Sequence, residues 1–240
     1  MINVGSESDG LKNATNGTSA SLTSTNNFIN FCKGKTITNG QQIKGGSCNP
    51  IPMGDIPNTD NIPTCKYVFP QNFDTLKANQ AFTMKLAVAN VQLGVFTNAD
   101  TNYYAAPQQL NAKGQIIGHT HLVIEKIDSL KSTTPTKPLA FAFFKGVDTP
   151  AGADGTVSVP VPSGLPEGTY RCGTIGTQAN HIAWSVPVAQ HGILEDVVYV
   201  SRSLFLEYEN QLLTTTAILF FFSVLAKSSL LLFLKFFRSP

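Results

Sequence analysis

The sequence predicts an all-β protein, folded as a single antiparallel β-sandwich of the immunoglobulin-like or jelly-roll type. Charged residues make up only 13% of the 240 residues, whereas Gly (19) and Pro (14) are plentiful, a composition typical of turn-rich domains. Short runs of alternating or β-branched residues recur at intervals typical of a sandwich or barrel. Between residues 27 and 200 no stretch of useful length has a helical period.

Three regions differ in composition. Residues 1–26 are mostly Ser, Thr, Asn and Gly, so we expect a disordered polar leader. Residues 27–203 form the predicted β-sandwich domain, which opens with an irregular, cysteine-containing stretch rich in Gly and Pro. Residues 204–240 form a hydrophobic tail.

The strands are predicted from local alternation. Residues 81–91 alternate most clearly, and residues 139–145 are the most aromatic. Residues 164–172, GLPEGTYRC, resemble the turn of immunoglobulin-like sandwiches in which a tyrosine, here Tyr170, packs at the start of a strand. The other predicted strands are residues 66–69, 115–127, 156–161, 182–189 and 197–200, with residues 103–110 a loop or short strand.

Residues 114–125, GQIIGHTHLVIE, hold the strongest candidate for chemistry. Successive side chains of a strand point to opposite faces, so His119 and His121 share one face about 7 Å apart, and Glu125 lies on that face too. Imidazoles and a carboxylate suit one divalent metal ion with open positions for water or substrate. His181 and His191 can complete such a site from other strands. The alternative is that these polar residues lie on the wet face of a strand and bind no metal.

The four cysteines have no C-x-x-C spacing, which argues against a zinc site and for disulfides. Four cysteines allow three pairings. We favour Cys32–Cys48, a disulfide that would stabilise the folded state by about 3 kcal/mol through the loop it closes, together with Cys65–Cys172, which would tie the start of the domain to its end. Sequons at Asn13 and Asn16 fit a glycoprotein of the secretory pathway.

The first residues, MINVGSESDG, lack the apolar region of a signal peptide. Either a signal sequence precedes this start, or the protein is intracellular and its thiols are reduced. We expect the first, and therefore an extracellular protein.

The charge balance argues against nucleic acid as a partner. The net charge is +2, and the tail with Arg202 supplies all of it. Without these residues 13 of the 17 basic and 13 of the 15 acidic residues remain, so the domain is neutral. A neutral domain is a poor nucleic-acid binder.

The tail contains an apolar run at residues 217–234, close to the length that spans a bilayer. It can be a transmembrane helix that anchors the protein, in which case Lys227 near its middle would raise the free energy of membrane insertion by about 3 kcal/mol. It can also be the removable tail of a lipid-anchor signal, or translated noncoding sequence from a faulty gene model. We give the last interpretation the most weight, and a membrane is a partner only if the tail is genuine.

Several long motifs follow one another in the sequence: NFINFCKGKTITNGQQIKGGSCNPIPMGDIP, FTNADTNYYAAPQQLNAKGQIIGHTHLVIE, FAFFKG, GLPEGTYR and NHIAWSVPVAQHG. In this order they resemble a family of small secreted fungal proteins, common in basidiomycetes and including plant-associated rusts. The resemblance covers about residues 27–196, and all four histidines fall inside its motifs. It implies secretion, an all-β fold, and a role at the fungal surface or the host interface, without an established activity.

Two functions follow. The first, which we favour, is a noncatalytic binding module with cell-wall polysaccharide or a host protein as partner. Tyr103, Tyr104 and Trp184 are its candidate platform for sugar rings, although core packing is the better interpretation of Trp184. The alternative is a metal-dependent enzyme built on the His-x-His-x-x-x-Glu pattern of residues 119–125.

Overall fold

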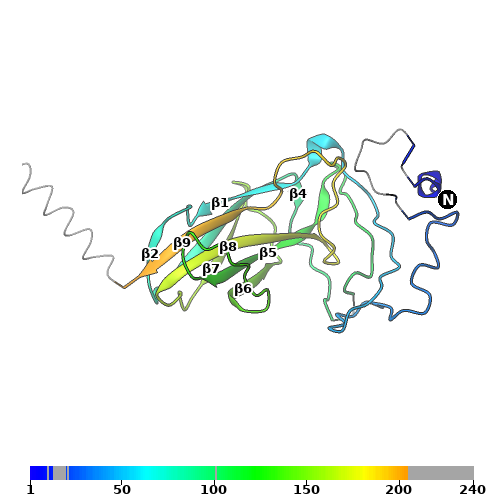
Figure 1. The fold of residues 1–240 in the computed structure, drawn as a ribbon. Coiled ribbons are helices and arrows are strands. Elements are labelled where there is room, and N and C mark those ends of the chain that lie inside the picture. The colour runs from blue at the N-terminus through cyan, green and yellow to red at the C-terminus, as the bar shows by residue number, and fades with distance from the viewer. Residues whose placement is uncertain (10, 13–19, 21, 101, 205–240) are drawn as a thin grey trace, which may run out of the picture.

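A computed structural model describes residues 1–9, 11, 12, 20, 22–100 and 102–204, and it confirms the all-β prediction. Within these residues the secondary structure is nine strands and two 3-10 turns, η1 (Val4–Glu7) and η2 (Thr59–Asn61). The strands form two sheets that pack against each other as a sandwich (Figure 1).

The smaller sheet is antiparallel, in the order β1-β3-β7, and the larger has the order β2-β9-β8-β5-β4. β6 also pairs with β5, further along the same strand than β4. The β2–β9 and β4–β5 pairs are parallel, so the larger sheet is mixed. The strands are β1 (Thr64–Phe69), β2 (Thr75–Lys77), β3 (Phe82–Ala89), β4 (Val91–Gln92), β5 (Ile116–Ile127), β6 (Phe141–Val147), β7 (Thr156–Val161), β8 (Gly168–Gln178) and β9 (Val197–Ser203).

One predicted strand is absent. Residues 182–189 form only an isolated bridge between Ala183 and Thr177, because a tight turn at residues 178–182 and the proline at position 187 interrupt pairing. The strand that the turn at residues 164–172 enters is β8, and it continues to Gln178.

The core lies between the sheets. Leu122 and Ile124 of β5 face Met84 and Leu86 of β3, and all four are fully buried. The turn before β8 forms as predicted: Tyr170 is buried, and its hydroxyl donates to the Pro166 carbonyl over 3.0 Å. This bond ties the loop to the first residues of the strand.

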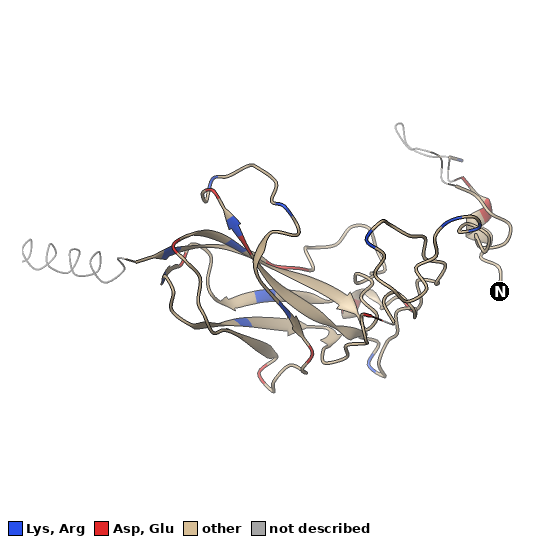
Figure 2. Ribbon diagram, turned by 90° about the horizontal axis from the view of Figure 1, so that it is seen from below, with Lys and Arg blue, Asp and Glu red and all other residues tan. Residues whose placement is uncertain are grey.

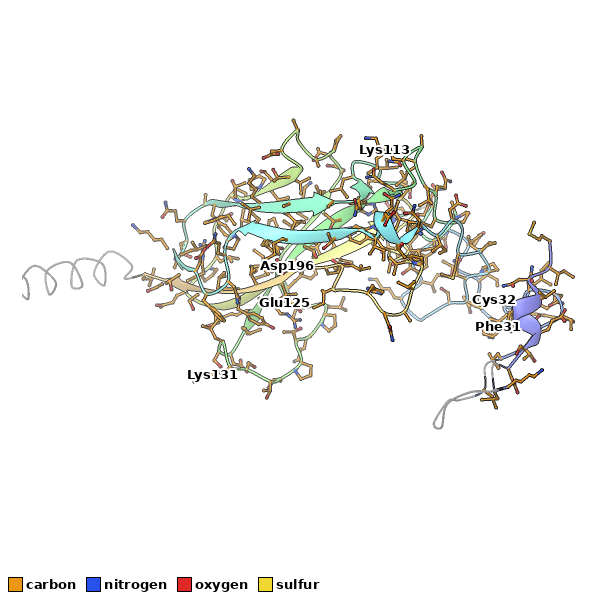
Figure 3. The ribbon with its side chains drawn as sticks, turned by 90° about the horizontal axis from the view of Figure 1, so that it is seen from above. Phe31, Cys32, Lys113, Glu125, Lys131 and Asp196 are labelled. Atoms are coloured by element: carbon orange, nitrogen blue, oxygen red, sulfur yellow. A yellow bond between two sulfur atoms is a disulfide. The ribbon has the colours of Figure 1, made fainter. Side chains whose placement is uncertain are left out.

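The N-terminal segment, residues 22–62, runs past one end of the sandwich in irregular loops (Figure 1). Cys32, labelled in Figure 3, bonds to Cys48, which confirms that prediction. The loop that this disulfide closes contacts the loop after β4 twice. The Tyr103 amide donates to the Gly40 carbonyl over 2.8 Å, and Gln42 Nε2 donates to the Ala99 carbonyl over 3.0 Å.

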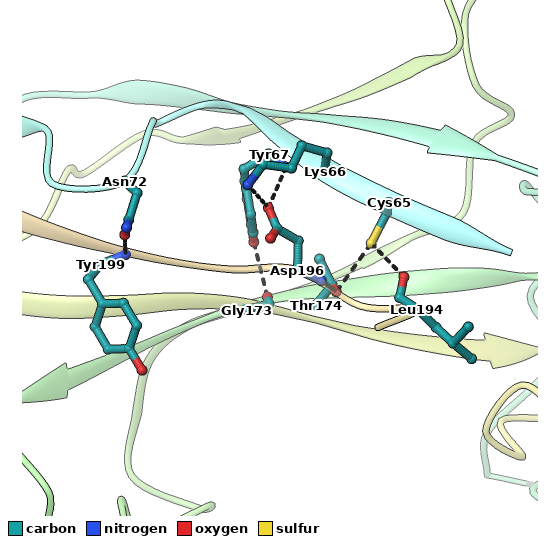
Figure 4. Close-up of polar contacts among 9 residues, drawn as sticks. All are labelled: Cys65, Lys66, Tyr67, Asn72, Gly173, Thr174, Leu194, Asp196 and Tyr199. Atoms are coloured by element: carbon teal, nitrogen blue, oxygen red, sulfur yellow. Dashed lines mark hydrogen bonds and ion pairs between the residues drawn. The ribbon is translucent and has the colours of Figure 1, made fainter. Parts of the chain in front are cut away.

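The predicted Cys65–Cys172 disulfide is wrong, because both cysteines are free and buried. They lie on β1 and β8, in opposite sheets, and the Cys65 sulfur is turned toward Thr174 Oγ1 (3.5 Å) and the Leu194 carbonyl (3.4 Å; Figure 4). Burial raises the pKa of the Cys65 thiol to about 11 and that of Cys172 to about 12. Both sulfurs are therefore protonated and unreactive in the folded protein.

Acidic and basic residues are spread over the sheets and loops of the part that the structure describes (Figure 2). Within that part no helix is long and apolar enough to cross a membrane. The sequons at Asn13 and Asn16 and the tail from residue 205 onward, including the predicted span at residues 217–234, lie outside the described residues.

The free cysteines predict a definite thiol count. Without reductant, we expect the folded chain to react slowly or not at all with a thiol reagent, and two thiols to react once guanidinium unfolds it. Labelling followed by mass spectrometry should place the label on Cys65 and Cys172. Zero reactive thiols in the unfolded chain would instead establish the second disulfide.

Two glycines of β8 predict unequal effects of one added methyl group. A Cβ on Gly176 would lie 2.3 Å from the ring of Trp184, whereas a Cβ on Gly173 would make an ordinary contact of 3.5 Å with Val197. We expect Gly176→Ala to lower the free energy of unfolding by about 1–3 kcal/mol and to shift the emission of Trp184, the only tryptophan. Gly173→Ala is the matched control and should leave both unchanged; equal effects of the two would contradict the packing described.

Candidate metal centre and its cavity

Three histidines meet at one end of the larger sheet. His119 and His121 project from the outer face of β5, and His181 reaches them from the turn that follows β8. One ring nitrogen from each lies within 4.8 Å of the other two, and all three residues are buried. The His119 and His121 rings meet edge to face, 4.9 Å between centroids.

The turn at residues 178–182 positions His181. Its backbone has φ +75°, a left-handed conformation that few non-glycine residues adopt. The turn is held by its own hydrogen bonds and by the loop after β4, since the Asn180 carbonyl accepts from the Tyr104 amide over 2.9 Å. This conformation directs the imidazole back over β5, where its centroid lies 4.7 Å from that of His119.

Backbone carbonyls fix the protonation of the two strand histidines. His119 Nδ1 lies 3.1 Å from the Val95 carbonyl, and His121 Nδ1 lies 3.4 Å from the Ile175 carbonyl. A carbonyl can only accept, so each of these nitrogens carries the ring proton. Each Nε2 therefore presents a lone pair, as in metal-binding histidines whose other ring nitrogen donates its proton to a carbonyl or carboxylate oxygen.

His181 lacks the partners that a buried imidazole normally has. Neither of its ring nitrogens makes a hydrogen bond within the described part of the chain, although both are shielded from solvent. Leaving a buried polar group unpaired costs about 1–3 kcal/mol. Coordination of a metal ion would satisfy one of these nitrogens.

The imidazoles are suited to metal binding because they are held neutral. Burial lowers the pKa of His119 to about 4, with a further contribution from His121 and His181. Burial also lowers the pKa of His121 and of His181. A neutral ring has the free lone pair that a metal requires.

The dimensions fit a three-histidine centre after a small adjustment. Nitrogens bound to one Zn²⁺ at about 2.1 Å in tetrahedral geometry lie about 3.4 Å apart. The ligand nitrogens would need to approach one another by up to about 1.4 Å from their separations of up to 4.8 Å. Three protein ligands leave a tetrahedral ion one open position.

A cavity of about 460 Å³ opens beside the histidines. His121 and His181 form part of its wall, and the remainder is largely aromatic and apolar. Phe144 of β6 packs against His121 at 5.0 Å between centroids, and Phe96 packs against His119 at 4.5 Å. The other lining residues are Gln42, Phe96, Ala99, Tyr103, Tyr104, Phe144, Ile175, Thr177 and Ala183.

Glu125 and His191 do not join the three histidines. Glu125 lies on the same face of β5, but four residues along a strand cover about 13 Å, and its carboxylate accepts from Arg171 Nε over 2.9 Å. Burial alone would raise the pKa of Glu125, but hydrogen bonds from Thr136 and Arg171 lower it. Figure 3 shows Glu125 beside the strands of the two sheets, far from Cys32 in the N-terminal segment. His191 is exposed, with Nδ1 2.7 Å from the Gly192 carbonyl.

The three residues predicted to form a platform for sugar rings lie in two different environments. Tyr103 and Tyr104 stack on each other, 4.1 Å between centroids, and both line the cavity. Trp184 is buried over Gly176, so it offers no face to solvent. The tyrosines therefore belong to the cavity that the histidines border, and Trp184 packs in the interior.

Sequence reasoning missed Phe96, Phe144 and Thr177 as site residues. Phe96 follows β4, and Thr177 lies in β8. The Thr177 hydroxyl oxygen lies 3.1 Å from His119 Nε2. No local sequence pattern marks either residue. Phe144 could have been found by pairing strands, because it lies opposite Val123, a neighbour of the histidines on the same face of the sheet.

Fold and site together define an all-β domain with a buried three-histidine cluster beside an aromatic cavity. The CLU5d N-terminal domain family matches residues 65–203, more than half of the chain, and the chain belongs to this family. A curated relative, pathogenicity cluster 5 protein d of Colletotrichum graminicola, is 43% identical over 171 residues. The match covers 71% of this chain and 36% of the relative, so the chain spans about a third of the relative's length.

These comparisons support the fungal part of the resemblance noted in the sequence. All three clustered histidines lie inside the family match, as do Tyr103 and Phe144. The loop closed by Cys32–Cys48 lies outside it. Secretion and a narrower fungal group stay predictions.

The lowered histidine pKa values predict acid sensitivity of the metal-free protein. His119 has a pKa of about 4 when folded, below the ordinary value of 6.5, so the unfolded chain binds more protons between these values. The stabilising effect of a neutral His119 is complete above pH 6.5 and is lost as the pH falls toward 4, by up to about 3 kcal/mol. Denaturant unfolding in chelator at pH 7.5, 6, 5 and 4.5 measures it.

A variant that removes the imidazole supplies the control for this experiment. His119→Gln should reduce the dependence of stability on pH, because the glutamine side chain does not titrate. A stability that stays level from pH 7.5 to 4.5 would show that the buried imidazoles do not remain neutral as described.

Proposed function

We propose that this domain is an extracellular, noncatalytic binding module that holds one divalent transition-metal ion with His119, His121 and His181. The metal presents its open position to the aromatic cavity and so takes part in binding a small ligand. The observation that carries the proposal is the convergence of three neutral imidazoles on one point, one of them with both ring nitrogens buried and unpaired.

The donor set favours zinc or copper. Three imidazole nitrogens without a carboxylate suit Zn²⁺ and Cu²⁺, whereas Ca²⁺ and Mg²⁺ prefer oxygen ligands. The hydrogen bonds from His119 and His121 to the backbone carbonyls of Val95 and Ile175 orient the two rings, as hydrogen bonds to metal-binding histidines commonly do.

Binding is favoured over catalysis by what lines the cavity. Among the described residues that line it, none is Asp, Glu or Lys, so apart from the imidazoles no strong general base or acid faces the open metal position. Glu125, the carboxylate of the alternative enzyme hypothesis, is engaged by Arg171 and Thr136. A small ligand is favoured over a polysaccharide because the aromatic residues line a cavity, and Trp184 is buried.

Extracellular placement is part of the proposal and is supported by the Cys32–Cys48 disulfide, since such bonds persist in oxidising compartments. The relative's name connects that protein to pathogenicity. By extension we propose that this domain acts outside the fungal cell, where the small ligand comes from the surroundings or from a host.

Metal content tests the proposal. We expect the full chain, produced with its disulfide and dialysed against Zn²⁺, to retain about one equivalent by elemental mass spectrometry. His181→Asn should lose it, because asparagine tolerates the left-handed backbone of this turn but supplies no imidazole. Bound Zn²⁺ should also raise the free energy of unfolding, by about 2.7 kcal/mol at a hundredfold excess over Kd.

Two control variants separate this site from the wider set of candidate ligands. His191→Ala and Glu125→Gln should both retain the metal, because neither side chain belongs to the cluster. Loss of metal in either control, or equal retention by His181→Asn and the unaltered protein, would refute the three-histidine assignment.

A further inference from the structure

The charge of the proposed metal centre is not balanced by the protein. Three neutral imidazoles and a divalent ion carry a net charge of +2, and the described cavity residues include no carboxylate. A buried charge is costly unless it is paired with an opposite charge. An anionic donor at the open position is therefore the ligand that this centre stabilises most.

The wall facing that position suits an apolar ring. The cavity is lined by Phe144, Tyr103, Tyr104 and Ile175, among others. The volume of the cavity, about 460 Å³, falls within the usual range for small-molecule sites. Phe144 and Ile175 are each 45% exposed at the cavity, although both are large apolar side chains. A planar apolar group lying against them would remove this surface from water.

A glycine on β6 allows the rings of Phe96 and His121 to pack close to that strand. Gly146 of β6 pairs directly with His121, and a Cβ there would lie 3.1 Å from Phe96 and 3.4 Å from the His121 ring. Any larger residue at this position would crowd the imidazole and the phenyl ring that line the cavity.

Hydroxyl groups at the same cavity can bind a second anionic oxygen. The Thr177 hydroxyl lies 3.1 Å from His119 Nε2, and metal binding at that nitrogen would free it to donate elsewhere. Burial raises the pKa of Tyr103 to about 12, so its phenol keeps its proton at neutral pH. A carboxylate, with two oxygens, would use both the metal and such a donor.

We propose that the metal-loaded cavity binds a small aromatic carboxylate, with one carboxylate oxygen on the metal ion and the ring against Phe144 and the Tyr103–Tyr104 pair. This inference rests on the proposed function, because the metal supplies the positive charge. It adds the chemical class of the ligand.

The test uses the full chain loaded with Co²⁺, whose visible spectrum changes with its ligands, and three probes. Benzoate carries both ring and charge, acetate only the charge, and benzyl alcohol only the ring. We expect benzoate to change the spectrum and to bind about tenfold more tightly than acetate, since an aromatic contact contributes about 1.4 kcal/mol. Benzyl alcohol should leave the spectrum unchanged.

Two exposed phenylalanines localise the ring. Phe144→Ala should weaken benzoate binding about tenfold without altering acetate binding or metal content. Phe31 is similarly exposed, at 51%, but lies outside the cavity lining and contacts Phe28 and Lys35, so Phe31→Ala should leave the benzoate affinity unchanged.

The outcomes distinguish this inference from the proposed function. Metal retention with equal affinity for benzoate and acetate, or with no spectral change on adding benzoate, would overturn the ligand class and leave the metal site intact. Equal loss of benzoate affinity in the two phenylalanine variants would also overturn it. Failure to retain any metal would overturn both proposals.

Discussion

Burial of β5 on both of its faces is the constraint on which the site depends. A strand of a sandwich usually has one face in the core and one in water. Here Leu122 and Ile124 face the core, while His119 and His121 on the other face are covered by the loop after β4 and by the turn at residues 178–182. That cover excludes water from the imidazoles, holds them neutral and leaves two backbone carbonyls and the Thr177 hydroxyl as their hydrogen-bond partners.

Much of this arrangement could be predicted from local sequence, because the strand period is two residues. That period places His119 and His121 on one face, and the likeness of residues 164–172 to an immunoglobulin-type turn predicts that Tyr170 packs at the start of β8. The same period also places Glu125 on that face. A shared face does not imply proximity, however, and four residues along a strand put Glu125 about 13 Å from His121. Sequence separation likewise could not show whether Cys65 and Cys172, in opposite sheets, are bonded.

Other parts of the site depend on contacts between distant segments. His181 reaches the cluster only through a left-handed turn, and Phe96 only through a loop that follows the edge of β5. Residues 182–189 look like a strand, yet the turn before them and the proline within them prevent pairing. Such features follow from the packed fold as a whole, so a linear pattern contains no sign of them.

The loop closed by the Cys32–Cys48 disulfide supports some parts of the site more directly than others. Gly40 and Gln42 lie between Cys32 and Cys48 and support the loop that includes Ala99 and Tyr103. His119 and His121 lie on β5, whereas the turn that carries His181 is held by the Tyr104 amide of that same loop. Reduction of the disulfide would therefore loosen one cavity wall directly and the turn of His181 through it, while the two histidines of β5 would keep their support from the sheet.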